Sequence, residues 1–226
     1  MRGLAEIDTI GVVGAGTMGS GIAQVAVEAG FEVVLRDVET DLVEAGVDRV
    51  EDGLERRVEN SALTDEEAAT ARDRLHATTD LAELSAADFV VEAVVEDVDV
   101  KREVFADLDG VTDEGVVLAT NTSTLSITTI ASATDRPERV VGLHFMNPVP
   151  LMDGVEVVVG EKTAPAVVDL AHDLAAALDK ETWEADDKPG FVTNRILMPW
   201  INEGIRAYDE GVASKADIDR GMELGT

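Results

Sequence analysis

The 226-residue sequence contains no cysteine. A disulfide framework and a thiolate metal site are therefore both excluded, and we expect no bound metal. No uninterrupted apolar run approaches the length of about 18 residues that marks a transmembrane helix. The first residues also lack the long apolar region of a secretion signal. We therefore expect a soluble cytoplasmic protein.

Basic residues are scarce as well. Lysine and arginine number 18 against 47 aspartates and glutamates, which gives a formal net charge of −29. Nucleic acid and anionic membranes attract basic surfaces, so both are excluded as partners. The acidic residues are spread along the chain, and with only five lysines this pattern predicts a halophilic protein, kept soluble in concentrated salt. The alternative is an ordinary acidic cytoplasmic enzyme.

Apolar segments of strand length alternate with helical segments along most of the chain. Strands are predicted over residues 7–13, 31–35, 75–78, 89–94, 116–120, 139–145 and 155–159. This alternation predicts an α/β fold with a Rossmann-type, doubly wound parallel sheet over residues 1–188. A strongly charged helical excursion is expected at about 40–74. After a Lys-Pro-Gly turn, residues 189–226 are predicted to begin an all-α domain.

A glycine-rich turn follows the first predicted strand and opens a helix. Its glycines, Gly14, Gly16 and Gly19, have the G-x-G-x-x-G spacing of a dinucleotide-binding loop. They allow a tight turn, close approach of a pyrophosphate and packing of the helix against the strand. Asp37 ends the second strand, where a carboxylate binds ribose hydroxyls and repels a 2′-phosphate. The predicted cofactor is therefore NAD rather than NADP.

One histidine stands out among the three in the sequence. His144 ends a predicted strand, on the side of the sheet where ligands gather. Glu156 lies in an otherwise apolar strand twelve residues later, and a buried carboxylate needs a partner. Together the two predict a general base with its cationic form stabilised. His76 and His172 are interpreted as structural or exposed.

The chain closely resembles the L-3-hydroxyacyl-CoA dehydrogenase family, which includes 3-hydroxybutyryl-CoA dehydrogenases. The matching segments are residues 14–24 (GAGTMGSGIAQ), 91–96 (VEAVVE), 121–123 (NTS), 142–150 (GLHFMNPVP) and 189–195 (PGFVTNR). The resemblance runs from residue 7 to the last residue, and together these motifs are highly specific.

The resemblance implies roles for individual residues. His144 is expected to be the catalytic base and Glu156 its partner, while Ser123 contacts substrate and nicotinamide, and Asn194 lies near the reacting oxygen. Further cofactor-binding residues are expected at Met18, Glu96, Lys101, Asn121 and Asn147.

The leading hypothesis is NAD-dependent, reversible oxidation of an L-3-hydroxyacyl-CoA to a 3-oxoacyl-CoA in fatty-acid or short-chain acyl-CoA metabolism. The alternatives are a related sugar-acid dehydrogenase and a non-enzymatic dinucleotide-binding protein. The family also implies a homodimer formed through the helical domain, which is expected to continue past residue 226, so that this chain would be a truncated form. The resemblance implies that basic residues of the helical excursion bind the CoA phosphates. In this chain the excursion is acidic, and its available cations are Arg49, Arg56 and Arg57.

Overall fold

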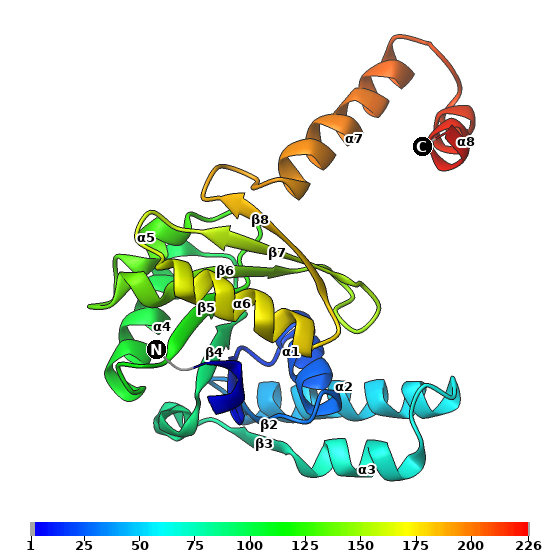
Figure 1. Ribbon diagram of the computed structural model, residues 1–226. Helices are drawn as coiled ribbons and strands as arrows, with labels where there is room; N and C mark the ends of the chain where they lie inside the picture. Colours follow the sequence, from blue (N-terminus) through cyan, green and yellow to red (C-terminus); the bar gives the residue numbers. More distant parts are fainter. Residues whose placement is uncertain (1–2, 226) are drawn as a thin grey trace.

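The computed structural model describes residues 3–225, and its main body is one eight-stranded sheet with helices on both faces (Figure 1). The strands are β1 (Thr9–Val13), β2 (Glu32–Arg36), β3 (Leu75–Thr78), β4 (Phe89–Glu92), β5 (Val117–Thr120), β6 (Val140–Phe145), β7 (Gly154–Val159) and β8 (Glu181–Asp186). The α-helices are α1 (Thr17–Glu28), α2 (Thr40–Glu59), α3 (Asp65–Asp73), α4 (Val98–Val111), α5 (Ile127–Ala131), α6 (Pro165–Ala177), α7 (Thr193–Asp209) and α8 (Lys215–Gly225). Short 3-10 helices occur at η1 (Leu4–Glu6), η2 (Leu81–Ala86) and η3 (Pro137–Arg139).

The strand order is β3-β2-β1-β4-β5-β6-β7-β8, which confirms the doubly wound arrangement. Strands β1 to β6 are mutually parallel, as predicted. Strand β7, however, runs antiparallel to β6, and β8 is parallel to β7. The reversal follows from the link over residues 146–153, because a parallel return needs a crossover of about a dozen residues or more.

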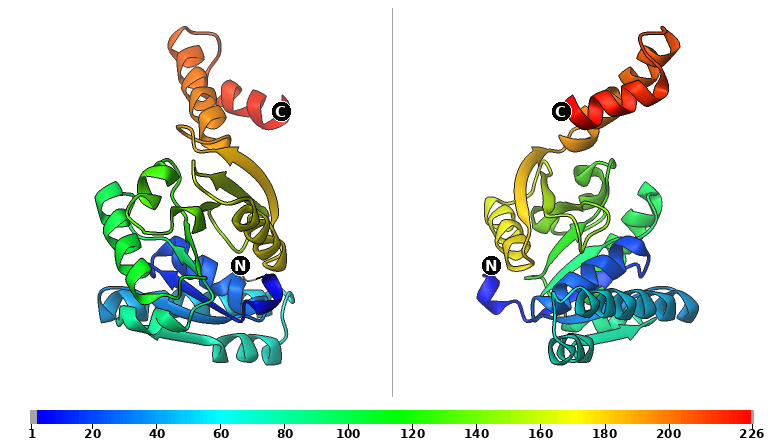
Figure 2. Two further views of the ribbon diagram at one scale, coloured as in Figure 1. Left: turned by 60° about the vertical axis from the view of Figure 1, so that its left-hand side comes forward. Right: turned by 90° about the vertical axis from the view of Figure 1, so that its right-hand side faces the viewer.

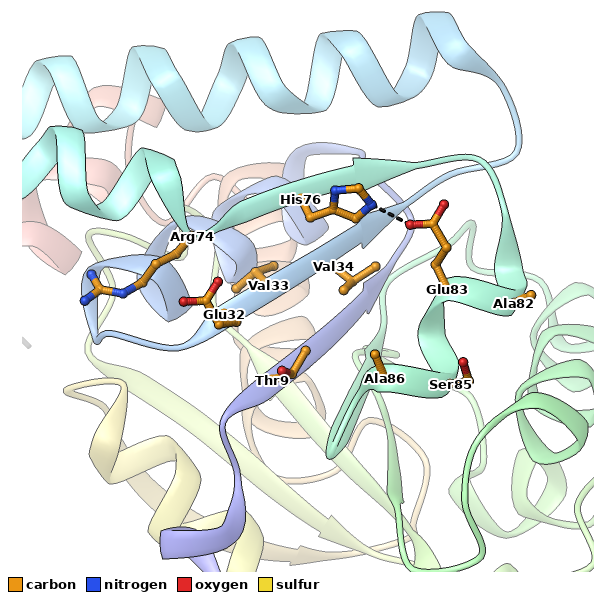
Figure 3. A pocket seen from close by; sticks show the side chains of 10 residues that line it. All are labelled: Thr9, Glu32, Val33, Val34, Arg74, His76, Ala82, Glu83, Ser85 and Ala86. Carbon is orange, nitrogen blue, oxygen red and sulfur yellow. Dashed lines mark hydrogen bonds and ion pairs between the residues drawn. The ribbon is translucent and has the colours of Figure 1, made fainter.

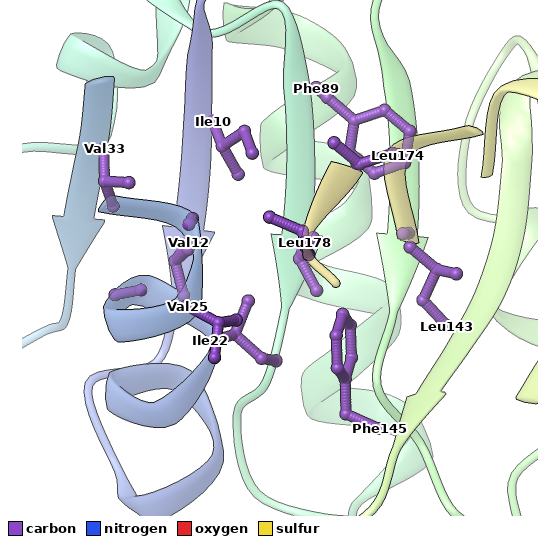
Figure 4. Packing of buried hydrophobic residues seen from close by; sticks show 14 of the residues in the cluster. Ile10, Val12, Ile22, Val25, Val33, Phe89, Leu143, Phe145, Leu174 and Leu178 are labelled. Carbon is purple, nitrogen blue, oxygen red and sulfur yellow. The ribbon is translucent and has the colours of Figure 1, made fainter. Parts of the chain in front are cut away.

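Two apolar clusters hold the helices to the sheet. One joins α1, α2 and α6 to one face, and the other joins α4 and α5 to the opposite face. Figure 4 shows the first cluster, with Ile22 of α1 and Leu174 of α6 packed over strand residues such as Phe89. The charged excursion is formed by α2 and α3, and α2 contributes Val50 and Leu54 to this core.

The last two helices project from the sheet (Figures 1 and 2). No residue of α7 or α8 within the described chain is buried, although α7 is strongly amphipathic. Its exposed apolar side chains include Ile196, Leu197, Met198, Trp200, Ile201, Ile205 and Tyr208. None of the helices formed by residues 3–225 is long and apolar enough to cross a lipid bilayer.

Candidate active site

The predicted site residues gather at one edge of the sheet. Strands β1, β2, β4 and β5 are parallel and end at Val13, Arg36, Glu92 and Thr120, and β6 ends beside them. The glycine-rich loop, Asp37, Glu96, the segment 121–123 and His144 therefore lie at the carboxyl edge. In open α/β sheets this is the edge where ligands bind.

The glycine-rich loop has the geometry of a cradle for a phosphate group. Gly14 has a φ of 99°, and a Cβ atom there would lie 2.6 Å from the carbonyl oxygen of Ala93. A Cβ atom on Gly19 would lie 1.7 Å from the carbonyl oxygen of Gly14, so α1 could not approach so closely with any other residue. A Cβ on Gly16, by contrast, would meet no atom within 4 Å, which leaves its backbone open above the amino end of α1. A dinucleotide's pyrophosphate fits this arrangement.

Asp37 follows β2 and is tied to the same loop. One carboxylate oxygen accepts a hydrogen bond of 2.7 Å from the backbone N–H of Ala15, and the other accepts one from Val38. These contacts hold the carboxylate beside the glycine-rich loop, where NAD ribose hydroxyls would need an acceptor. Arg49 of α2 also contacts this loop and donates to the carbonyl oxygen of Ala15 at 3.1 Å.

A buried ion pair supports the loop after β4. The Lys101 ammonium lies 2.7 Å from a carboxylate oxygen of Glu92, and their side chains are 1% and 0% exposed. The same ammonium lies 3.5 Å from Glu96. The other oxygen of Glu92 accepts a hydrogen bond of 2.7 Å from the Thr120 hydroxyl. Lys101 thus joins a core carboxylate to the surface carboxylate that faces the segment 121–124.

Glu96 organises the loop that carries Ser123. Its Oε1 atom accepts hydrogen bonds from the Ser123 backbone N–H at 2.8 Å and from the Ser123 and Thr122 hydroxyls. Burial raises the pKa of Glu96, but these donors and the nearby Lys101 outweigh it and lower the pKa overall. The Asn194 side-chain amide donates to the Ser123 carbonyl oxygen at 3.0 Å, which brings the start of α7 to this loop.

Asn121 connects the neighbouring strand ends. Its side-chain oxygen accepts a hydrogen bond of 2.9 Å from the backbone N–H of Phe145, the last residue of β6. The residue that precedes Phe145 is His144, so the polar segment after β5 and the histidine are fixed relative to each other.

His144 and Glu156 form the predicted pair. They face each other across the β6–β7 ladder, and the His144 Nδ1 atom lies 3.1 Å from Glu156 Oε2. Glu156 is fully buried. The ring of Phe191, a residue with a φ of 50°, packs edge-on against the imidazole with ring centroids 6.0 Å apart.

The hydrogen bonds of Glu156 fix its charge and the histidine tautomer. Its Oε1 atom accepts from the Trp183 indole at 3.0 Å and from the backbone N–H groups of Val192 and Thr193. Burial raises the pKa of Glu156, but the bonds from His144 and from these donors lower it overall. An ionised carboxylate only accepts, so the proton between the two residues lies on His144 Nδ1. In the neutral imidazole the Nε2 atom, which has no hydrogen-bond partner within residues 3–225, is then the proton acceptor.

The remaining histidines lie elsewhere. His76 of β3 is exposed and pairs with Glu83, while His172 of α6 contacts Thr182 and Glu184. Figure 3 shows His76 and Glu83 at a pocket of about 550 Å³ whose lining includes Thr9, at the start of β1. This pocket is separate from the carboxyl edge.

Two further predicted cofactor residues, Met18 and Asn147, lie beside the elements that carry the site. Met18, in the first turn of α1, packs partly against the core, and Asn147 is exposed in the link after β6. Both lie next to the carboxyl edge, at the ends of elements that also carry the glycine-rich loop and His144.

Comparisons with known proteins identify the family. The family described as 3-hydroxyacyl-CoA dehydrogenase, NAD binding domain, matches residues 9–188, and its C-terminal domain matches residues 190–226. The chain belongs to the 3-hydroxyacyl-CoA dehydrogenase family. It is 44% identical over 221 residues to the 3-hydroxybutyryl-CoA dehydrogenase of Bradyrhizobium diazoefficiens, which covers 98% of this chain and 75% of that protein.

Two further relatives of the 3-hydroxyacyl-CoA dehydrogenase family agree. The human mitochondrial hydroxyacyl-coenzyme A dehydrogenase is 42% identical, over 95% of this chain and 70% of that protein. The crystal structure of the (S)-3-hydroxybutyryl-CoA dehydrogenase from Ralstonia eutropha superposes with a TM-score of 0.95 at 41% identity, covering 97% of this chain and 78% of the other. The predicted fold, enzyme class and NAD cofactor are thereby confirmed: the chain is an NAD-dependent 3-hydroxyacyl-CoA dehydrogenase by family.

Sequence reasoning assigned no role to Glu92 and Trp183, although both contact predicted site residues. Glu92 ends an apolar strand, and the argument that singled out Glu156 applies to it equally, with Lys101 nine residues later as the partner. No feature of the sequence indicated a role for Trp183, because its contact with Glu156 depends on the register between β7 and β8.

Proposed function

We propose that this protein oxidises an L-3-hydroxyacyl-CoA to the 3-oxoacyl-CoA, reversibly and with NAD. The observation that carries the proposal is the His144–Glu156 pair, with a buried ionised carboxylate on Nδ1 and, among the described residues 3–225, no hydrogen-bond partner on Nε2 at the carboxyl edge. A secondary alcohol loses a proton and a hydride in this reaction, and a neutral imidazole held in one orientation suits removal of the proton.

His144 Nε2 takes the hydroxyl proton of the substrate. The imidazolium that forms is stabilised by Glu156, which stays ionised because donors surround it. Bound NAD supplies the acceptor for the hydride. Ser123 and Asn194 are neutral and would hydrogen-bond the substrate oxygen, and the bond from the Asn194 amide to the Ser123 backbone carbonyl supports their acting together. Neutral groups orient this oxygen without trapping charge on it.

We also propose how the glycine-rich loop and the carboxyl edge of the sheet bind NAD. Gly14, Gly16 and Gly19 would surround the pyrophosphate, with Met18 in the same turn, and Asp37 would accept hydrogen bonds from the ribose. The carboxyl-edge residues Glu96, Lys101, Asn121 and Asn147 would shape the nicotinamide side. Lys101 would act there through Glu96, because its ammonium is buried between two carboxylates.

We further propose that residues 1–188 form the NAD-binding domain, and that residues 189–226 belong to a helical domain through which two copies form a homodimer. The apolar side chains of α7 and α8 border a groove of about 860 Å³ that includes Leu197, Trp200, Ile218 and Met222. A second copy would cover this surface. Light scattering in molar salt should give twice the chain mass, and a monomer at every concentration would contradict the dimer.

The substrate class is tested by following NADH consumption. Acetoacetyl-CoA should be reduced rapidly, whereas a 3-oxo sugar acid without CoA should be turned over far more slowly. A series of 3-oxoacyl-CoAs of increasing chain length then defines the preferred acyl group. Efficient turnover of the sugar acid together with none of any acyl-CoA would refute the proposal.

A further inference from the structure

The pair of His144 and Glu156 is part of a longer row. His144 of β6 lies opposite Glu156 of β7, and Glu156 is in register with Trp183 of β8. Cross-strand partners point to the same face of a sheet, so three adjacent strands present an imidazole, a carboxylate and an indole side by side. The indole N–H donates to Glu156 Oε1 at 3.0 Å, on the opposite side of the carboxylate from His144.

A glycine makes room for the indole. Gly154 lies two residues before Glu156 on β7, so it faces the same side of the sheet. A Cβ atom at this position would lie 2.8 Å from the Trp183 ring. The ring therefore occupies the space that a side chain at 154 would fill, and from there its N–H reaches the carboxylate.

We propose that Trp183 is a positioning residue for the reaction, which orients the Glu156 carboxylate and partly neutralises the charge that it presents to the proposed base, His144. The inference rests on the proposed function. In this role Trp183 acts through its hydrogen bond to Glu156.

The charged surroundings of Glu156 are simple. Within residues 3–225, its hydrogen bonds and ion pairs involve one ionisable side chain, that of His144. Helix α7 contributes backbone N–H groups, and β8 contributes the indole. The neighbours of Trp183 on β8, Thr182 and Glu184, contact His172 of α6 on the other face of the sheet.

The sign of the effect follows from charge. Without the indole donor, Glu156 carries more negative charge toward His144, which favours the imidazolium form that cannot accept the substrate proton. The acid limb of the oxidation rate should therefore move to higher pH, by about 0.5–1 pH unit. On this limb the turnover number should fall about three- to tenfold, because a shift of about 0.5–1 pH unit changes the unprotonated fraction of the base by that factor.

The variant Trp183→Phe tests this, because it keeps an aromatic ring and removes the N–H. We expect KM for the acyl-CoA and binding of NADH to stay within about twofold of wild type, while the pH limb and the turnover number change as stated. The same substitution in a Glu156→Gln background should add less than about twofold to the loss. An unmoved pH limb, or an equal loss in both backgrounds, would overturn the proposal.

A second variant tests the contact between Trp183 and Glu156 by a substitution on β7, the strand next to that of Trp183. Gly154→Ala should push the ring from Glu156 and shift the acid limb in the same direction, and it should add little when Trp183 is already Phe. This variant decides the question if Trp183→Phe does not fold. An unshifted profile in Gly154→Ala with the ring shown to be displaced would overturn the role.

An NMR experiment separates this inference from the proposed function. The chain has two tryptophans, so Trp200→Phe leaves the Trp183 indole as the only such N–H signal. In that background, Glu156→Gln should move the indole signal markedly. A stationary signal would overturn the contact even in an active enzyme. If wild type turns over no acyl-CoA, the proposed function fails, whereas a moving signal still establishes the contact.

Discussion

Removing the ammonium of Lys101 should be among the most destabilising single changes at the site. Lys101→Met keeps the aliphatic stem and leaves the Glu92 carboxylate, whose side chain is 0% exposed, without its counter-ion. Breaking a buried pair in this way typically costs about 3–5 kcal/mol. Donors from Thr120 and the Val94 backbone remain on Glu92, so we expect a loss near the lower end, about 3 kcal/mol.

The loss is measured as a change in Tm. For a chain of this size, 1 kcal/mol corresponds to about 2–4 °C, so Lys101→Met should melt about 6–12 °C below wild type in circular dichroism scans at fixed salt. The double variant Glu92→Gln/Lys101→Met removes the orphaned charge and should recover at least half of the loss. The exposed Lys162→Met is the matched control and should change the free energy of unfolding by no more than about 0.5 kcal/mol. A single variant within about 2 °C of the control, or a double variant no more stable than the single, would refute the reasoning.

Four further predictions address the cofactor, the base, acid stability and salt. Asp37→Ser should weaken the use of NADH and narrow the gap to NADPH in steady-state kinetics, and a wild type that prefers NADPH would contradict the ribose argument. His144→Gln should bind NADH normally and lose about 10²–10⁴ in turnover, whereas near-normal turnover would exclude it as the base. Burial raises the pKa of Asp187, but hydrogen bonds from Thr128, Ser126 and Ile127 lower it overall. Its stabilisation is therefore complete above the usual value of 3.8 and is lost as the pH falls through the lowered pKa, so Asp187→Asn should flatten the decline of Tm in this acid range. With a charge of −29, Tm should climb steeply between about 10 mM and 1 M salt, where the Debye length falls from about 30 Å to about 3 Å, and a flat Tm would argue against halophilic adaptation.

Local sequence patterns were sufficient to predict most of the fold and much of the candidate site. The glycine triplet, Asp37 and His144 each sit where a strand ends, so the parallel order of β1 to β6 alone places them at one edge. The reversal at β7 was not predicted, because alternation with helices indicates parallel strands and no helix lies between β6 and β7, over the described residues 146–153. Only the length of the link before Gly154 carried that information.

Contacts that depend on strand register or on packing between distant segments were harder to predict from the sequence. The Trp183 indole and Glu156 are 27 residues apart in the sequence and come together through the pairing of β7 and β8. Asn194 and Ser123 are 71 residues apart in the sequence. Neither spacing is periodic, so no pattern in the sequence connects them. The buried pair of Glu92 and Lys101 could have been predicted, because a carboxylate at the end of an apolar strand requires a counter-charge.

The attachment of Glu156 to the first turn of α7 has a thermodynamic consequence. One oxygen of this carboxylate faces His144, and the other accepts the backbone N–H groups of Val192 and Thr193. Anything that draws the start of α7 away removes donors from Glu156 and changes the basicity of the pair. By linkage, a change of charge on the pair must alter the position of that turn with the same free energy. Proton transfer at the sheet edge and the position of the first turn of α7 are therefore coupled in both directions through a single side chain.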